Sequence, residues 1–323
     1  MYLDLNKALS YDKLFTFIIG ARGIGKTFAS KKHCINRFLK YDEEFIYVRR
    51  NKSDLKKINL FFNDIREQFP DHKLEMKNGV MHIDGKVAGY SIPLSTSATQ
   101  KSTPYPKVGW IIFDEFIIDK GYQRYLPNEV DAFLELYSTI ARLRDVKVIF
   151  LSNAISVTNP YFTYFHLDIT NNREFFTQGE IVVQLVKNEE YANAAKQTRF
   201  GKLIAGTEYS SYAVDNEFLR DSNEFIAKRS ANSALLFNLH TRSNTYGVWY
   251  DSKERVFNVS KDFNPDYNIE YSTDILSHME NTTLITKKHP YLFEQFVTAY
   301  LHGKTTFETI QIKNEVLREI KYA

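Results

Sequence analysis

The 323-residue sequence predicts an α/β domain built on a parallel sheet, followed by a smaller α+β domain. Three observations support this prediction. In residues 1–187, short apolar runs alternate with segments of helical periodicity, as in parallel strands connected by helices. Residues 225–323 read instead as successive strands joined by turns, and helices follow them. Residues 188–224 are polar and weakly patterned, and we assign them to a linker or lid.

Apolar runs and helical spacing define the elements of the first domain. Strands are predicted over residues 14–19, 45–48, 108–113, 147–151 and 181–186. Helices are predicted over residues 26–39, 54–69 and 128–143. In the second of these helices, apolar residues recur at helical spacing up to Pro70, which ends the pattern: Leu55, Ile58, Phe62, Ile65 and Phe69.

Residues 74–94 break this alternation. Asn78-Gly79 and Asp84-Gly85 are hairpin turn signals, which predict a small antiparallel meander inserted between the core elements. In the second domain, strands are expected over residues 235–240, 246–250, 255–259 and 267–271, and helices near residues 291–301 and 307–320.

The composition is that of a soluble globular protein, with 43% hydrophobic and 25% charged residues. The sequence has no run of about 18 uncharged apolar residues and no signal-peptide pattern at its N-terminus. The single cysteine, Cys34, cannot form an intramolecular disulfide, which fits a reducing compartment. We therefore expect a soluble, cytoplasmic protein. Because the net charge is only +3, any contact with nucleic acid must come from local basic clusters.

A phosphate-binding loop is predicted between the first strand and the first helix. The segment matches the pattern GxxxxGK[ST] at every fixed position, with residues Gly20, Ala21, Arg22, Gly23, Ile24, Gly25, Lys26 and Thr27. Its glycines allow backbone N–H groups to surround the phosphates of ATP, and the helix dipole favours the negative charge. Lys26 should reach the β- and γ-phosphates, and the Thr27 hydroxyl should bind Mg²⁺. The alternative is a glycine-rich turn with an incidental Lys-Thr, but the flanking strand and helix favour the phosphate site.

Two carboxylates, Asp114 and Glu115, end the buried strand over residues 108–113. A strand end beside a phosphate loop is the place for an aspartate that holds Mg²⁺, and we assign this role to Asp114. Glu115 can then orient and polarise a water molecule for attack on the γ-phosphate, which argues against a small-molecule kinase. On its own, such a pair is more often a turn or a helix cap.

Asn153 follows the next strand, over residues 147–151. A polar residue at this strand end can sense whether a γ-phosphate is present. The alternative is an asparagine that only begins a loop.

Basic residues near the end of the helix over residues 128–143 are candidates for action on a neighbouring subunit. Arginine stabilises the charge of a transferring phosphoryl group, and we favour Arg142 for this role, with Arg144 as the second choice. Lys101, in a polar loop, is a weaker candidate. The alternative is that cations near a helix C-terminus only complement the helix dipole.

A further basic cluster follows the second strand and comprises Arg49, Arg50, Lys52, Lys56 and Lys57. It could contact DNA phosphates independently of base sequence, and Lys56 and Lys57 are the first residues to test. The alternative is a solvated helix start.

These segments, taken together, resemble the DNA-encapsidation (packaging) ATPases of φ29-type bacteriophages. The resemblance covers nearly the whole chain. It is carried by Ser-Tyr-Asp at 10–12, Ile-Ile-Gly-Ala-Arg-Gly-Ile-Gly-Lys-Thr at 18–27, Phe-Ile-Tyr-Val-Arg-Arg at 45–50, Phe-Asp-Glu-Phe at 113–116, Pro-Asn-Glu-Val at 127–130, Leu-Ser-Asn-Ala at 151–154, Asn-Pro-Tyr-Phe at 159–162, Thr-Arg-Phe-Gly at 198–201 and Gly-Thr-Glu-Tyr at 206–209.

The resemblance implies a pentameric ring of identical subunits on the portal vertex of an empty procapsid. A phage structural RNA belongs to this assembly, and ATP hydrolysis moves double-stranded DNA inward. The protein would then act in the host cytoplasm, transiently docked on the procapsid. The first domain would be an additional-strand ring ATPase with a RecA-like sheet, and the second an RNase H-like nuclease that has lost its catalytic carboxylates. Arg142 falls at the family's trans-acting arginine and Lys101 at a lysine of the corresponding loop, while Arg144 is aligned less securely.

The second domain lacks an evident set of carboxylates for two-metal nuclease chemistry. Its candidates lie in turns and loops rather than at strand centres: Asp251, Glu254, Asp262 and Asp266. We therefore expect a docking or DNA-guiding module. Two alternatives stay open, a terminase-like protein with an active nuclease and a P-loop switch that binds nucleotide without translocation.

Overall fold

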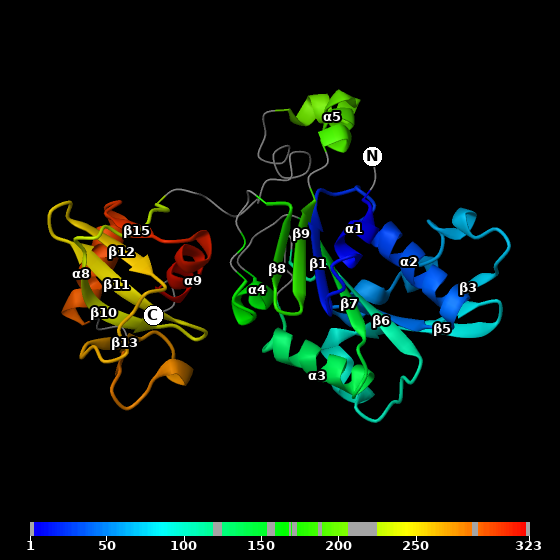
Figure 1. Ribbon diagram of the computed structural model, residues 1–323, viewed down its shortest axis with the longest axis horizontal. Coiled ribbons are helices and arrows are strands. Elements are labelled where there is room, and N and C mark those ends of the chain that lie inside the picture. The colour runs from blue at the N-terminus through cyan, green and yellow to red at the C-terminus, as the bar shows by residue number, and fades with distance from the viewer. Residues whose placement is uncertain are drawn as a thin grey trace. The chain divides into compact units, whose positions relative to one another are not determined.

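The computed structural model describes residues 3–118, 125–153, 159–167, 169, 173–186, 189–205, 225–285 and 290–320. The chain forms two compact units, drawn in Figure 1. The first comprises Met1–Ser156 and Ile169–Leu219, and the second comprises Val157–Asp168 and Arg220–Ala323. Most of the expected linker, residues 206–224, lies outside the described residues.

The first unit contains a nine-stranded sheet with the strand order β3-β4-β5-β2-β6-β7-β1-β9-β8. Its parallel strands are β1 (Phe15–Gly20), β2 (Glu44–Arg49), β5 (Lys86–Pro93), β6 (Val108–Asp114), β7 (Lys147–Ser152) and β9 (Ile181–Val186). The antiparallel edge strands are β3 (Leu74–Lys77), β4 (Val80–Ile83) and β8 (Phe175–Gln178). The prediction of an α/β fold with a parallel sheet is confirmed.

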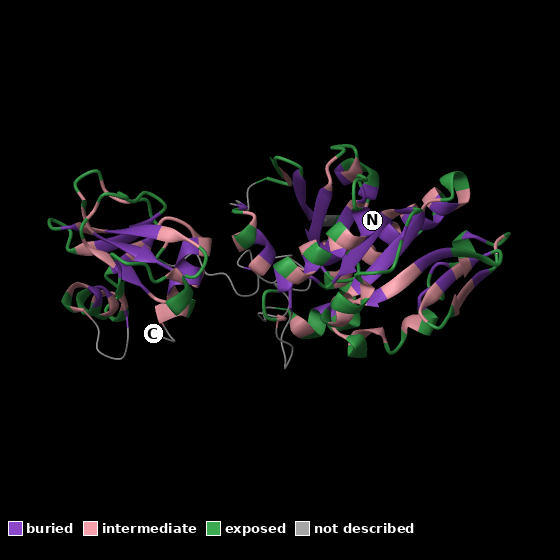
Figure 2. Ribbon diagram, turned by 90° about the horizontal axis from the view of Figure 1, so that it is seen from below, coloured by how far each residue is buried: buried purple, intermediate pink, exposed green. Residues whose placement is uncertain are grey.

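Two helices cover opposite faces of this sheet (Figure 1). Helix α2 (Lys26–Tyr41) packs on the face that carries Ile18, Ile112 and Ile149. Helix α3 (Glu129–Ala141) packs on the other face, where Phe133 contacts the rings of Phe113 and Phe150. Successive strand residues point to opposite faces, so one strand supplies both layers. The central strands are accordingly buried, as Figure 2 shows in purple.

The meander over residues 74–94 is not a separate insertion. Its turns are as predicted, with left-handed backbone at Asn78-Gly79 and Asp84-Gly85. However, β5 pairs in parallel with β2, so the meander extends the main sheet at this edge. Strand β8 was not predicted, because it is short and only partly buried.

The prediction of an α-helix over residues 54–69 is wrong. The segment forms three short 3₁₀ helices, at Lys52–Leu55, Ile58–Leu60 and Arg66–Gln68. The apolar residues of this segment still contribute to the core, since Phe62 and Ile65 are buried. The Asp54 carboxylate accepts a hydrogen bond from the backbone N–H group of Asn51, and local bonds of this kind favour a turn over an α-helix.

Short helices complete the first unit, namely α1 (Leu5–Leu9), α5 (Glu189–Gln197) and α6 (Arg199–Ile204), while α4 (Pro160–Tyr164) falls in the second unit. Among the described residues, no helix combines the length and the apolar character needed to cross a membrane.

The second unit contains a six-stranded sheet with the strand order β14-β13-β10-β11-β12-β15. The strands β10 (Ala234–His240), β11 (Thr245–Asp251) and β12 (Val256–Ser260) form an antiparallel meander. Three short strands extend it in parallel, β13 (Glu270–Ser272), β14 (Thr283–Leu284) and β15 (Thr305–Phe307). Helices α8 (Tyr291–Leu301) and α9 (Ile310–Ile320) pack their apolar faces on this sheet. The second unit thus combines a mixed sheet with two packed helices, and its RNase H-like character stays a prediction.

Candidate nucleotide-binding site

Three adjacent strands bring the predicted residues to one edge of the first sheet. Strands β6, β7 and β1 are neighbours, and all of them run in the same direction. Their carboxyl ends therefore lie side by side and carry Asp114, Asn153 and the phosphate loop. In the register of the sheet, Asp114 lies opposite Leu151, and Ile19 lies opposite Ser152.

The phosphate loop requires its glycines. Gly23 and Gly25 have φ values of 86° and 84°, a left-handed conformation that other residues rarely adopt. A β-carbon at Gly20 would lie 2.5 Å from the Ile24 side chain and 2.9 Å from Val186. The loop is thus packed against β9 and leads directly into α2, which begins at Lys26.

Lys26 is buried at the centre of the site, with 8% of its surface exposed. Its ammonium group donates hydrogen bonds to the carbonyl oxygens of Gly20 at 2.8 Å and Ala21 at 2.7 Å, and to Asn153 Oδ1 at 3.1 Å. Burial lowers the pKa of Lys26 to about 8, and the nearby Asp114 carboxylate opposes this shift. The contact with Asn153 joins the end of β7 to the phosphate loop.

Asp114 faces the start of α2 and is itself buried. Thr27 Oγ1 donates to Asp114 Oδ2 at 3.1 Å, and the hydroxyl of Tyr47 donates to the same oxygen at 2.8 Å. Hard oxygen ligands of this kind suit Mg²⁺, which usually takes one or two protein ligands beside phosphate oxygens and water. The described residues hold no group of three or more His, Cys, Asp or Glu that could bind a metal ion alone. The side chains therefore fit Mg²⁺ that arrives with a nucleotide.

Glu115 projects from a left-handed backbone position with a φ value of 60°. Its carboxylate pairs with Arg49 Nη2 at 2.5 Å. More than half of this side chain is exposed, yet the protein around its carboxyl group raises the pKa of Glu115, and the positive charge of Arg49 opposes the shift. The neighbouring Asp114 carboxylate adds a second negative charge, which also raises the pKa of Glu115. Such a carboxylate can act as a base towards water.

The predicted basic cluster is only partly exposed. Arg50 is 2% exposed and forms a two-pronged ion pair with Glu129, with N–O distances of 2.7 and 2.9 Å. Arg50 is thus a structural residue, and Arg49 belongs to the nucleotide site. Lys56 and Lys57 are exposed as expected.

Arg142 and Arg144 lie in the turn after α3 but differ in their surroundings. The guanidinium group of Arg144 donates to the carbonyl oxygens of Tyr105, Val108 and Ile140 at 2.6–2.7 Å. It therefore holds the turn in place rather than projecting from it. Arg142 is exposed, with a φ value of 53° and a ψ value of −107°. Lys101, at the end of the polar loop, pairs with Glu135 on α3 at 3.0 Å, and both side chains are exposed.

The candidate carboxylates of the second unit do not converge. Asp251 Oδ1 accepts hydrogen bonds from the backbone N–H groups of Lys253 and Glu254, and these bonds lower its pKa. Asp262 pairs with Arg229 at 3.1 Å, and Glu254 and Asp266 are exposed. Asp251 therefore stabilises a turn.

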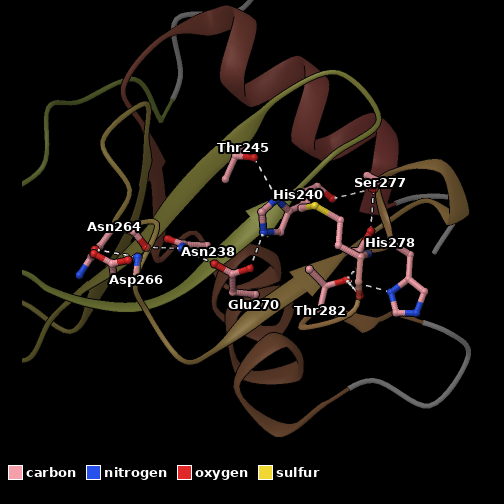
Figure 3. A network of polar contacts seen from close by, with 11 residues as sticks. Asn238, His240, Thr245, Asn264, Asp266, Glu270, Ser277, His278 and Thr282 are labelled. Carbon is pink, nitrogen blue, oxygen red and sulfur yellow. Dashed lines mark hydrogen bonds and ion pairs between the residues drawn. The ribbon is translucent and has the colours of Figure 1, made fainter.

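A polar network lies between β10 and the adjacent parallel strand β13 of this unit (Figure 3). Glu270 accepts a hydrogen bond from Asn238 Nδ2 at 3.1 Å and contacts His240 Nε2 at 3.2 Å. Glu270 is thus a single carboxylate that is held by the Asn238 amide and the His240 imidazole. Among the residues that the structure describes here, a carboxylate cluster for two metal ions is not found.

Sequence reasoning missed Tyr47 and the role of Arg49. Both precede the acidic pair by more than 60 residues, so no local motif connects them with it. The usable signal was strand periodicity: residue 49 directly follows the strand predicted over residues 45–48, and two residues' spacing places it on the same face as residue 47.

The phosphate loop, the acidic pair and the parallel sheet define a P-loop nucleotide-binding protein. The chain belongs to the Podovirus DNA encapsidation protein (Gp16) family, whose family model matches residues 1–322.

Known relatives extend this assignment. The chain is 42% identical over 324 residues to the DNA packaging protein of Bacillus phage PZA, covering 100% of this chain and 96% of that protein. In the bacteriophage phi29 viral genome packaging motor assembly, one chain is 41% identical, with a TM-score of 0.81 and 99% coverage of both chains. The crystal structure of the N-terminal domain of the phi29 DNA packaging ATPase is 47% identical, with a TM-score of 0.57, and covers 59% of this chain and 98% of that domain.

Proposed function

We propose that the chain is an ATP-hydrolysing motor subunit that drives double-stranded DNA into a phage procapsid. The observation that carries this proposal is the meeting of Lys26, Asp114 and Asn153 at one sheet edge, with Glu115 beside them. Family membership and the likeness to phi29 packaging proteins support DNA packaging as the process that the hydrolysis drives.

Each residue of the site has its own role in ATP hydrolysis. The loop from Gly20 to Thr27 binds the triphosphate through its backbone N–H groups and through Lys26. Thr27 and Asp114 would hold Mg²⁺, which would neutralise charge on the phosphates. Glu115 orients the attacking water. Asn153, which contacts Lys26 at 3.1 Å, responds to the γ-phosphate that competes for the same ammonium group.

Arg142 acts on the nucleotide of a neighbouring subunit in a homopentameric ring. Arg144 anchors its turn at the amino end of β6, and Asp114 lies at the carboxyl end. At about 3.3 Å per residue, the two ends of this strand are about 20 Å apart, so Arg142 does not reach its own site. Arg144 is engaged within its own subunit, and Lys101 is the weaker candidate because it pairs with Glu135.

The remaining partners follow from the family and from the exposed cations. Such a ring would dock on the portal of the procapsid, together with the phage structural RNA, while the protein is otherwise in the host cytoplasm. Lys56 and Lys57 are exposed and available for DNA phosphates. The second unit serves docking or DNA guidance.

Two substitutions test the mechanism. Lys26→Ala should abolish nucleotide binding, because the buried ammonium group that meets the phosphates is lost. Glu115→Gln should still bind ATP, but its hydrolysis rate should fall by about 10²–10⁴-fold, since the amide cannot accept a proton. Hydrolysis is measured with DNA and procapsids present. Lys32→Ala, an exposed lysine on the same helix, is the matched control. Normal hydrolysis by Lys26→Ala would contradict the mechanism.

The same assays separate the alternatives. Tight nucleotide binding without turnover, with or without DNA and procapsids, would favour a switch. Cleavage of plasmid DNA in Mn²⁺ that is lost in Asp251→Ala would favour an active nuclease.

A further inference from the structure

Asp114 is oriented by a residue outside the phosphate loop. The Tyr47 hydroxyl on β2 donates to Asp114 Oδ2 at 2.8 Å, and Thr27 Oγ1 donates to the same oxygen at 3.1 Å. Two donors that converge on one oxygen fix the rotation of the carboxylate. Neither of these hydrogen bonds involves Oδ1, which is therefore left available for another ligand.

Packing holds the Tyr47 ring in one position. The residue is 7% exposed, and its ring lies edge-on against Phe61, with a centroid distance of 5.0 Å. Phe61 is itself buried in the core under α2. A ring enclosed in this way has few alternative rotamers, so its hydroxyl approaches Asp114 from one direction.

The same strand holds the second carboxylate of the acidic pair. Tyr47 and Arg49 are two residues apart on β2, so they share one face of the sheet. Strand β2 pairs with β6, with Val48 opposite Phe113, and Arg49 pairs with Glu115 at 2.5 Å. The end of β2 thus contacts both carboxylates, although it belongs to neither motif.

We propose that Tyr47 is a positioning residue that orients Asp114 for Mg²⁺. This inference rests on the proposed function, because it assigns to Asp114 the role of metal ligand. Outer partners that hold a ligand in place typically contribute 10- to 100-fold to metal affinity. The Tyr47 hydroxyl donates to Asp114 and also interacts with Arg49. Of these two residues only Asp114 is assigned to Mg²⁺, so the effect of Tyr47 on the metal passes through Asp114.

Tyr47→Phe tests the proposal, because it removes only the hydroxyl group. The full-length protein is mixed with a fluorescent ADP analogue, and Mg²⁺ is titrated while binding is followed. The Mg²⁺ concentration at half-saturation should rise by about 10-fold or more. The affinity for the analogue without Mg²⁺ should change by less than about 2-fold, since the phosphate loop is intact.

Tyr246→Phe is the matched control. Tyr246 is also buried and donates to a carboxylate, Glu315, at 2.8 Å, but it lies in the second unit. This variant should leave the Mg²⁺ dependence unchanged. In an Asp114→Asn background, Tyr47→Phe should raise the Mg²⁺ concentration at half-saturation by less than about 2-fold, because the carboxylate that Tyr47 orients is gone.

Each outcome decides the proposal. Equal half-saturation in wild type and Tyr47→Phe would overturn the role of Tyr47 while leaving the motor proposal intact. An equal effect of Tyr47→Phe with and without the Asp114 carboxylate would also overturn it, since the hydroxyl would then act by another route. Failure of the wild-type protein to bind the analogue would instead overturn the proposed function and this inference together.

Discussion

His33 shows how burial changes the chemistry of one residue in this fold. It lies on α2, and its ring packs edge-on against Trp110 with a centroid distance of 4.4 Å. His33 Nε2 is buried without a hydrogen-bond partner. Burial lowers the pKa of His33 from 6.5 to about 4, and Arg37 adds to the shift, while Glu43 opposes it and Lys147 contributes a further lowering. The folded protein therefore holds a neutral imidazole over most of the acidic range.

This shift predicts a stability that depends on pH. Below pH 6.5 the unfolded chain binds a proton at His33 that the folded chain does not bind until about pH 4. The free energy of unfolding should therefore be highest with respect to His33 above pH 6.5, and it should fall by up to about 3 kcal/mol as the pH drops to 4. In His33→Phe this part of the pH dependence should be absent. Urea unfolding of a Trp249→Phe background, followed by Trp110 fluorescence, reports on the first unit.

The control is His302→Gln, an exposed histidine of the second unit, which should keep the full pH dependence. An identical pH dependence in His33→Phe and wild type would contradict the prediction.

At the residue scale, sequence motifs predicted which side chains meet at the sheet edge. Lys26, Asp114 and Asn153 could be assigned because each follows a strand of the same parallel sheet, and such strand ends lie side by side. Arg50 could not be assigned correctly. Its neighbour Arg49 has the same charge, and only the position of Glu129, 79 residues away, decides that Arg50 is buried.

At the scale of elements, one ion pair joins β2 to α3. Arg50 follows β2, and Glu129 is the first residue of α3. Arg50 also donates to the carbonyl oxygens of Glu115 and Phe116 at 3.1 and 2.6 Å. The pair therefore connects the end of β2, the segment after β6 and the start of α3 at a single point.

Breaking this pair should destabilise the first unit strongly. Glu129→Gln leaves the Arg50 charge buried and uncompensated, which typically costs about 3–5 kcal/mol. The matched control lies on the same helix, since Glu135 forms an exposed ion pair with Lys101. Glu135→Gln should cost less than about 1 kcal/mol. Both values follow from urea unfolding monitored by Trp110 fluorescence in the Trp249→Phe background, and equal losses would contradict the buried role of Glu129.

Strands were easier to predict than the segments between them. Apolar runs identified β1, β2, β6, β7 and β9, because strands buried on both faces must be apolar throughout. The helix prediction for residues 54–69 failed, since apolar residues spaced three and four positions apart also fit consecutive 3₁₀ turns. The pairing of β5 with β2 was not predictable from its turns, which specify only the antiparallel neighbours.

At the scale of the whole molecule, the proposed ring makes a site depend on two subunits. In that ring, the first subunit would supply Lys26 and Glu115, and the next would supply Arg142 from the opposite end of its sheet. The turn that carries Arg142 is held by three hydrogen bonds from Arg144, so it is presented in a defined position. Alone, a subunit would hold a bound nucleotide without the charge stabilisation that Arg142 of a neighbouring subunit provides.

Subunit mixing tests this arrangement. Arg142→Ala and Glu115→Gln should each lose most of the DNA- and procapsid-stimulated ATPase, the former by about 10³-fold or more. In mixed rings, a Glu115→Gln subunit still donates its intact Arg142 to a neighbouring Arg142→Ala subunit, which retains its own Glu115. Mixing the two variants should therefore restore part of the activity, with a maximum near equal proportions, whereas mixing Arg142→Ala with an Arg142→Ala, Glu115→Gln double variant should not. If Arg142 acted within its own chain, both mixtures would stay equally inactive, and the ring interpretation of this residue would be wrong.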